Sequence, residues 1–177
     1  MRSKVIAICG APYVGKSTII GSIGKHIGQP NLLLQASETG PNARLDVIYN
    51  SIKLQFITRS GVYLYPESMI PKILVGAEVV IYVLEPCLPN GASLNFTHDY
   101  YKEYFDHFVY HAQKLNTFWT DIPWIVVLNK IDLARNPPPG ILRFPEILIG
   151  EIVGCVAAKD IGIPNLWSKL IKTIEQI

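Results

Sequence analysis

The pattern Gly-x-x-x-x-Gly-Lys-Ser at residues 10–17 has the spacing of a phosphate-binding loop. Glycines at its two ends let the backbone curl until successive amide groups point inward at a phosphate. Lys16 adds a cation for the outer phosphates, and the Ser17 hydroxyl can ligate Mg²⁺. Taken alone, the pattern also fits a glycine-rich turn with a surface lysine, so its surroundings decide between the two.

Those surroundings favour phosphate binding. The apolar run Lys4–Cys9 reads as a buried strand, and Ser17–His26 reads as a helix whose N-terminus adds a partial positive charge. Two residues inside the loop are unusual. Pro12 has no amide, which removes one donor, and Tyr13 either leans over the phosphates or caps the loop from outside.

A second polar motif, Asn-Lys-Ile-Asp at residues 129–132, ends the apolar run Trp124–Leu128. The Asp132 carboxylate can accept hydrogen bonds from the N1–H and 2-amino groups of guanine, a pair of donors that adenine lacks. The aliphatic stem of Lys130 can cover the base plane, and Asn129 can tie the base loop to the phosphate loop. A polar strand-to-helix turn is the alternative, which the phosphate loop earlier in the chain disfavours.

A third motif, Val-Ala-Ala-Lys at residues 156–159, follows the last predicted strand, Glu151–Val156. A small residue followed by a lysine lets a backbone amide reach the guanine oxygen. Alone, the motif fits a tight turn before the last helix better, and the other two motifs reverse that preference. Together the three motifs predict a site for GTP or GDP with Mg²⁺.

The elements that must position these motifs alternate between strand and helix. Asn50-Ser51 is a plausible hairpin turn between two strands, and β-branched runs mark strands that are buried on both faces. This order predicts an α/β fold with a mostly parallel open sheet, one antiparallel hairpin and helices on both faces. The remaining predicted strands are Leu45–Tyr49, Leu54–Thr58 and Val79–Leu84, and the remaining helices are Thr97–Asn116 and Pro164–Ile177.

Composition limits the other possibilities. The 177 residues are 49% apolar and 17% charged, which excludes a disordered chain and predicts one domain over residues 1–177. The net charge of +2 is too small to indicate a nucleic-acid partner. No apolar run reaches the ~18 residues of a membrane span, and neither end carries a lipidation motif, so no direct membrane anchor is expected. Three widely spaced cysteines fit a reducing cytoplasm.

In this order and context, the three motifs resemble those of the Ras-like small GTPases, whose fold is the P-loop G domain. Two stretches are similar to the bacterial gliding-motility (Mgl-type) small GTPases: Ala36–Thr39 with Asp46, as in switch I, and Thr58–Gly61 in the place of Asp-x-x-Gly. The resemblance implies switch loops that bind a protein regulator or effector, of the roadblock type in the Mgl case. The apolar and aromatic residues of Gly61–Pro71 fit such a surface.

The resemblance also implies roles for individual residues. Lys16 would act on the transferred phosphate, Ser17 would ligate magnesium, and Thr58 would lie just behind the metal ligands. Arg44 and Arg59 flank the expected γ-phosphate position and either stabilise transition-state charge or are solvated loop arginines. The nucleotide-contacting residues expected in this way are Gly10, Pro12, Tyr13, Val14, Gly15, Lys16, Ser17, Thr18, Gly61, Asn129, Lys130, Asp132, Ala157, Ala158 and Lys159.

Three departures weaken the expected catalysis. Val62 stands where Ras-like proteins have a water-orienting glutamine, and Pro41 with Asn42 replace the Arg-Thr pair of the Mgl-type switch I. We therefore expect a guanine-nucleotide-binding switch with slow GTP hydrolysis that needs a partner. A non-hydrolysing GTP/GDP-binding scaffold is the alternative, and a P-loop kinase or ATPase is disfavoured by the intact Asn-Lys-x-Asp motif.

Overall fold

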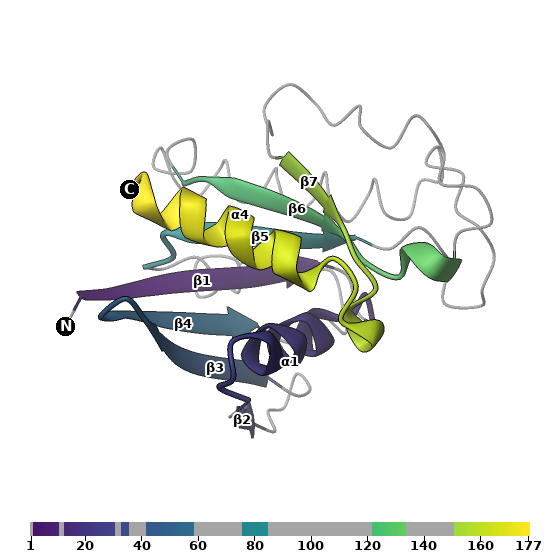
Figure 1. The fold of residues 1–177 in the computed structure, drawn as a ribbon, viewed down its shortest axis with the longest axis horizontal. Coiled ribbons are helices and arrows are strands. Elements are labelled where there is room, and N and C mark those ends of the chain that lie inside the picture. The colour runs from purple at the N-terminus through teal and green to yellow at the C-terminus, as the bar shows by residue number, and fades with distance from the viewer. Residues whose placement is uncertain are drawn as a thin grey trace, which may run out of the picture.

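The computed structural model describes residues 2–10, 13–30, 33–35, 42–58, 76–84, 122–133 and 151–177 of the chain (Figure 1). Their elements include a first strand followed by a helix and a last strand followed by a helix, as the sequence predicts. In chain order they are β1 (Arg2–Gly10), α1 (Lys16–His26), β2 (Leu33–Gln35), β3 (Asn42–Tyr49), β4 (Ile52–Thr58), β5 (Val79–Leu84), β6 (Trp124–Leu128), the short 3₁₀ helix η2 (Ile131–Leu133), β7 (Glu151–Gly154), the 3₁₀ helix η3 (Ala157–Lys159) and α4 (Ile163–Glu175).

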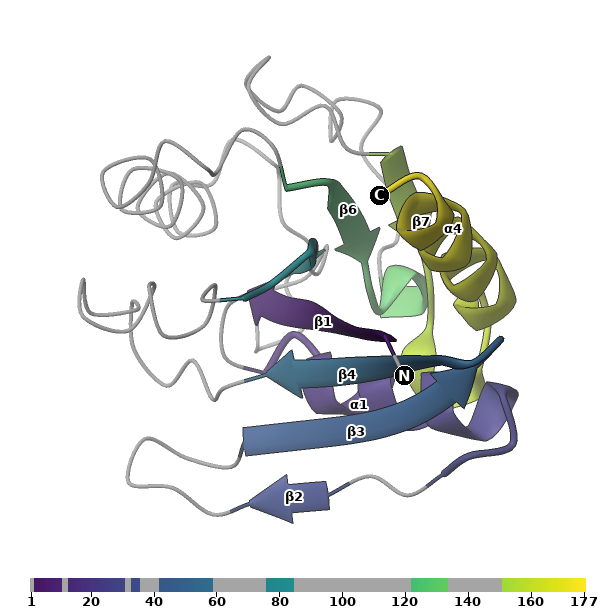
Figure 2. The same cartoon turned by 90° about the vertical axis from the view of Figure 1, so that its left-hand side faces the viewer.

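The strands form one seven-stranded sheet in the order β2-β3-β4-β1-β5-β6-β7, part of which is seen in Figure 2. Five of them, from β4 through β1 and β5 to β6 and β7, pair in parallel. The β3–β4 hairpin is antiparallel, which confirms the mostly parallel sheet with a hairpin. β2 adds a second antiparallel pair at the edge that the sequence did not predict, because a three-residue run carries no readable alternation.

The hairpin turn is formed by Asn50 and Ser51, as predicted. Both residues have positive φ angles, 46° and 64°. Two consecutive left-handed residues suit a two-residue hairpin because their twist matches that of the flanking strands. At the other end of the chain, β7 stops at Gly154 rather than at the predicted Val156, because Val156 folds back to pair with Ile161.

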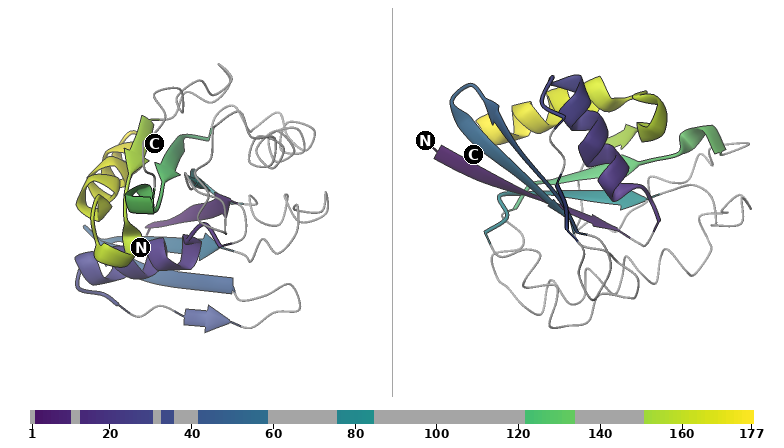
Figure 3. Two further views of the ribbon diagram at one scale, coloured as in Figure 1. Left: turned by 90° about the vertical axis from the view of Figure 1, so that its right-hand side faces the viewer. Right: turned by 90° about the horizontal axis from the view of Figure 1, so that it is seen from below.

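The helices α1 and α4 lie on the same face of the sheet, as the views in Figure 3 show. The core between them and the strands includes Ile8 and Phe56 from the sheet, Ile23 from α1 and Leu170 from α4, all buried completely. Trp167 of α4 packs edge-on against Tyr49, with ring centroids 5.3 Å apart. The helix predicted at Thr97–Asn116 lies outside the described residues.

A buried ion pair fastens the end of the sheet where β1 begins. Lys4 is 2% exposed, and its Nζ lies 2.7 Å from an oxygen of the Glu78 carboxylate. The other Glu78 oxygen accepts a hydrogen bond of 3.2 Å from the Val5 amide. Glu78, just before β5, therefore clamps β1 by both its main chain and its side chain, since its own amide donates to the Val5 carbonyl.

We expect Glu78→Gln to lower the free energy of unfolding by about 2 kcal/mol, because the buried ammonium of Lys4 would lose its counter-charge while the shape of the side chain is kept. Urea denaturation measures the change. Glu175→Gln at the exposed end of α4 is the control and should cost much less. Equal losses in the two variants would contradict a special contribution from the Lys4 pair.

The two ends of the chain meet near the start of β1, at this same end of the sheet. The guanidinium of Arg2 donates a hydrogen bond of 3.3 Å to the carbonyl of Ile177, and the right-hand view of Figure 3 shows the two ends next to each other. Within the described part of the chain, no helix is long and apolar enough to cross a membrane.

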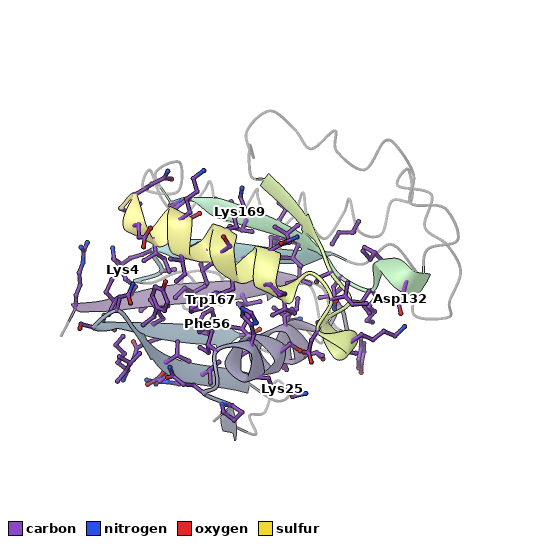
Figure 4. All side chains as sticks on the ribbon, viewed as in Figure 1. Lys4, Lys25, Phe56, Asp132, Trp167 and Lys169 are labelled. Carbon is purple, nitrogen blue, oxygen red and sulfur yellow. The ribbon has the colours of Figure 1, made fainter. Side chains whose placement is uncertain are left out.

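The carboxyl ends of the parallel strands lie level with one another at the opposite edge. In the register of the sheet, Ile8 pairs with Thr58, Gly10 with Val83, and Leu128 with Gly154. The three sequence motifs follow β1, β6 and β7, so they converge there. In Figure 4, Asp132 lies at this edge, far from Lys4 at the other.

Candidate nucleotide-binding site

Gly10 at the end of β1 and Gly15 just before α1 adopt backbone conformations that favour glycine. Gly10 has a φ angle of 138°, and a Cβ atom there would collide with the Val83 carbonyl oxygen. Gly15 has a φ angle of 93°, and its Cβ would collide with the side-chain amide of Asn129. α1 starts directly afterwards with no acidic residue in its first turn and no side-chain cap. The helix N-terminus thus keeps its affinity for an anion.

We expect Gly15→Ala to lower the free energy of unfolding much more than Gly28→Ala, which serves as its matched control. Both glycines have left-handed φ angles, 93° and 69°, so alanine strains the backbone at each. Only at Gly15 does the new methyl group also meet a neighbour, the Asn129 amide, whereas at Gly28 it meets nothing within 4 Å. We predict a further loss of about 2 kcal/mol for Gly15→Ala, measured as the difference in unfolding free energy. Similar losses for the two variants would contradict the close packing of Gly15 on Asn129.

Lys16 places a buried cation inside the loop. It is 7% exposed, and its Nζ donates a hydrogen bond of 3.0 Å to the Gly10 carbonyl. Burial lowers the pKa of Lys16 from 10.5 to about 8, against a smaller opposing effect of the neighbouring Cys9 thiol. A buried ammonium next to a helix N-terminus is an arrangement that a bound phosphate would stabilise.

Asn129 joins this loop to the other two motifs. It is 2% exposed, and its Nδ2 donates to the Val14 carbonyl at 2.8 Å. Its Oδ1 accepts from the Ala157 amide at 3.0 Å and from the Cys155 thiol at 3.4 Å. One side chain therefore bonds the phosphate loop and the loop after β7 at the same time, so the spacing between them is fixed.

Lys130 adds a second link. Its Nζ donates a hydrogen bond of 2.7 Å to the carbonyl of Tyr13. Tyr13 has a φ angle of 63°, and Lys130 holds this left-handed conformation from outside. The Tyr13 side chain is 79% exposed, so its ring stands at the surface of the loop.

Asp132 and Ala158 lie on the side of the site where a base would bind. Asp132 is in η2, and its Oδ2 lies 2.7 Å from Nζ of Lys159. The Ala157 amide is taken by Asn129. Among the described residues, no group accepts a hydrogen bond from the neighbouring Ala158 amide. Ala158 is exposed, and the next residue, Lys159, contacts the Asp132 carboxylate.

The predicted metal-binding residues lie at the same edge. Ser17 is half-buried in the first turn of α1, next to the exposed Thr18. Thr58, at the end of β4, is 1% exposed. Hydroxyl oxygens are suitable ligands for Mg²⁺, and with a nucleotide phosphate Ser17 could complete part of such a site. Within the described ranges, no group of three or more His, Cys, Asp or Glu side chains is placed to hold a metal ion.

Arg44 is engaged elsewhere. Its guanidinium makes two hydrogen bonds of 2.9 Å to the Asp46 carboxylate, and Lys53 lies 2.8 Å from the same group. The hydrogen bonds from Arg44 lower the pKa of Asp46 to about 2. This bidentate pair on β3 occupies the guanidinium that the sequence suggested for transition-state charge. Further predicted residues lie outside the described ranges: Pro12, Arg59, Gly61, Val62, the switch I stretch 36–41 and the switch II stretch 61–71.

One buried side chain of the site had no signal in the sequence. Ser22 lies inside α1, is 3% exposed, and donates a hydrogen bond of 2.7 Å to the carbonyl of Ala157. A serine within a helical pattern reads as neutral, and its partner is 135 residues away.

Comparison with known structures identifies the fold. The G domain of the FeoB iron transporter of T. maritima superposes with a TM-score of 0.62 at 16% sequence identity, covering 98% of this chain and 99% of that domain. Comparison with models of known protein families gives no match. Comparison with curated proteins gives none either. The chain therefore has the fold of a P-loop G domain, and this likeness does not single out the Mgl-type proteins.

Proposed function

We propose that the chain binds guanine nucleotides and works as a molecular switch. The observation that carries this proposal is the junction at Asn129, whose hydrogen bonds to Val14 and Ala157 hold a phosphate-type loop and a base-type loop at one edge of the sheet. The fold is that of a G domain, and in open α/β sheets ligands bind outside the carboxyl ends of the strands. Fold likeness alone does not assign a function, so the proposal depends on these residues.

On the phosphate side, three features act together. The backbone at Gly15 and in the first turn of α1 would offer amide groups, the N-terminus of α1 would add its dipole, and Lys16 would supply a cation. Ser17 would hold Mg²⁺ together with the phosphates, and Thr58 would lie behind it. The metal would neutralise charge on the outer phosphates.

On the base side, the Asp132 carboxylate would accept from the N1–H and 2-amino groups of guanine, and the Ala158 amide would donate to the oxygen at position 6. Adenine offers the opposite pattern of donors and acceptors at these positions, which would leave both groups unpaired. Lys159 now contacts one oxygen of Asp132, so this exposed ion pair would open when the base enters. Such a pair is worth only about 0.2–1 kcal/mol, which a nucleotide easily exceeds.

Hydrolysis would be slow. Water would attack the γ-phosphorus, and the bond to the β–γ bridging oxygen would break to give GDP and phosphate. Val62 cannot orient that water, and Arg44 is bound to Asp46. We therefore propose that a protein regulator at the switch loops supplies or orders the missing group. From the Mgl-type resemblance of Ala36–Thr39, we propose a roadblock-type dimer and a cytoplasmic setting for it.

Displacement of a fluorescent GDP analogue, mant-GDP, tests the proposal. GTP and GDP should displace it with Mg²⁺ present, whereas ATP should need a concentration at least about 100-fold higher because adenine cannot satisfy Asp132 and Ala158. Identification of the nucleotide released from freshly purified protein is an independent check. Comparable displacement by ATP would refute guanine selectivity and favour an ATPase or kinase.

A non-hydrolysing scaffold remains a second candidate, favoured by Val62. Single-turnover hydrolysis of GTP, with and without a roadblock-type dimer, separates the two. Hydrolysis that is slow alone and faster with the dimer supports the switch. No hydrolysis under either condition, with normal GTP binding, supports the scaffold.

A further inference from the structure

Ser22 makes an unusual contact for a serine inside a helix. Such serines normally face solvent or bond to a carbonyl of their own helix. Ser22 instead points across to the loop after β7, where α1 packs against η3, and donates its 2.7 Å hydrogen bond to the Ala157 carbonyl. The side chain is 3% exposed, so water does not compete for this bond.

The contact helps to orient one particular peptide group, whose carbonyl also accepts a hydrogen bond of 3.1 Å from the Asp160 amide. The carbonyl of Ala157 and the amide of Ala158 belong to the same peptide unit, which is planar and trans, so the two point in opposite directions. When Ser22 draws the carbonyl toward α1, the Ala158 amide must point away from α1. The preceding peptide is held as well, because the Ala157 amide donates to Asn129 at 3.0 Å.

We propose that Ser22 is a positioning residue for guanine recognition: by holding the Ala157 carbonyl, it aims the Ala158 amide at the oxygen at position 6 of the base. This inference rests on the proposed function. It also means that α1, whose first turn would hold the phosphates, sets the direction of a donor on the base side of the site.

The test compares three nucleotides that differ at single positions of the base. In 6-thio-GDP a sulfur, which is a weak acceptor, replaces the oxygen at position 6, and IDP lacks the 2-amino group that Asp132 would read. Wild-type protein should bind both more weakly than GDP. In Ser22→Ala we expect GDP to bind about five- to tenfold more weakly and the preference for GDP over 6-thio-GDP to fall toward one. The preference for GDP over IDP should remain at its wild-type value.

Two further variants separate the hydroxyl from packing. Ser22→Thr and Ser22→Val have the same shape but only threonine keeps the donor, so Thr should retain the preference for GDP over 6-thio-GDP and Val should lose it. This pair also answers the question if Ser22→Ala does not fold. Thr173→Ala removes a hydroxyl that bonds within α4, to Lys169, and should leave both preferences unchanged.

The outcomes are distinct. The inference would be overturned if Ser22→Thr and Ser22→Val showed the same preference for GDP over 6-thio-GDP. It would also be overturned if Ser22→Ala lowered the preferences for GDP over 6-thio-GDP and over IDP equally, because that would show a general loosening of the base loop. If the wild-type protein binds ADP as well as GDP, the proposed function itself fails, and this inference fails with it.

Discussion

Replacement of Lys16 by methionine is expected to abolish tight nucleotide binding while making the protein without nucleotide more stable. Binding should weaken about 100-fold or more, because methionine keeps the length of the side chain but removes the cation that faces the phosphates. Mant-GDP titration measures the loss. The opposite sign for stability follows from burial: the ammonium is 7% exposed, and removal from water lowers the pKa of Lys16.

The lowered pKa of Lys16 explains why its removal should stabilise the protein, and it predicts how stability depends on pH. The pKa of Lys16 is about 8 in the folded protein against an ordinary value of 10.5, so its charged form is disfavoured by folding. Near neutral pH, burial of the charged lysine therefore lowers the free energy of unfolding by about 3 kcal/mol. This cost disappears as pH rises from about 8 to about 10.5, so the protein should become more stable over that range. Lys16→Met should therefore unfold at higher urea concentration at pH 7 and lose most of this rise with pH.

Lys25→Met is the matched control. Lys25 lies in the last turn of the same helix, exposed, and is labelled in Figure 4. It should change nucleotide affinity little and lower stability slightly, since a cation there favours the helix dipole. A Lys16→Met protein that is less stable than wild type at pH 7 would show that the bond to Gly10 outweighs the burial of charge.

Replacement of Asp132 by asparagine should exchange one base preference for another. The amide can accept from N1–H but presents a donor to the 2-amino group of guanine, so GDP should bind about 100-fold more weakly. Xanthine carries an oxygen at that position, which the asparagine amide can donate to. XDP should therefore bind the variant better than GDP does, the reverse of the wild-type order, as competition against mant-GDP would show.

Asp160→Asn makes the same chemical change in the loop after β7. Asp160 is exposed with a φ angle of 56°, a conformation that asparagine accepts well, so folding should not change. GDP should remain preferred over XDP in this control. If Asp132→Asn also keeps full preference for GDP, Asp132 does not read the base.

Local patterns account for the parts of the fold that the sequence predicts well. β5 and β6 are continuous apolar runs and have the predicted bounds, and the turn at Asn50 and Ser51 is made by the residues that prefer it. β2 could not be predicted because its three residues are held only by pairing with β3. Val156 was assigned to β7 because it continues an apolar run, but its partner is Ile161.

At the candidate site, too, local sequence patterns could be predicted and contacts between distant residues could not. The glycines and Lys16 predict a phosphate loop because the pattern is local in the sequence, and a link through Asn129 can be expected once that pattern is recognised. The bond from Ser22 to Ala157 could not, since a helical serine gives no sign of a partner so distant in the chain. Arg44 was misleading for a simpler reason: Asp46, two residues along the same strand, points to the same side and takes its guanidinium.

The meeting of Arg2 with Ile177 has a practical consequence for engineering this domain. Because the two ends are neighbours, a short linker should join them, and new ends can then be opened in a surface connection without breaking the core. The ends also lie across the sheet from Gly10 and Asp132. Such a circular permutant, or a copy inserted into a loop of a reporter protein, would keep the proposed nucleotide site accessible, so a domain that binds as proposed would be a suitable scaffold for a biosensor.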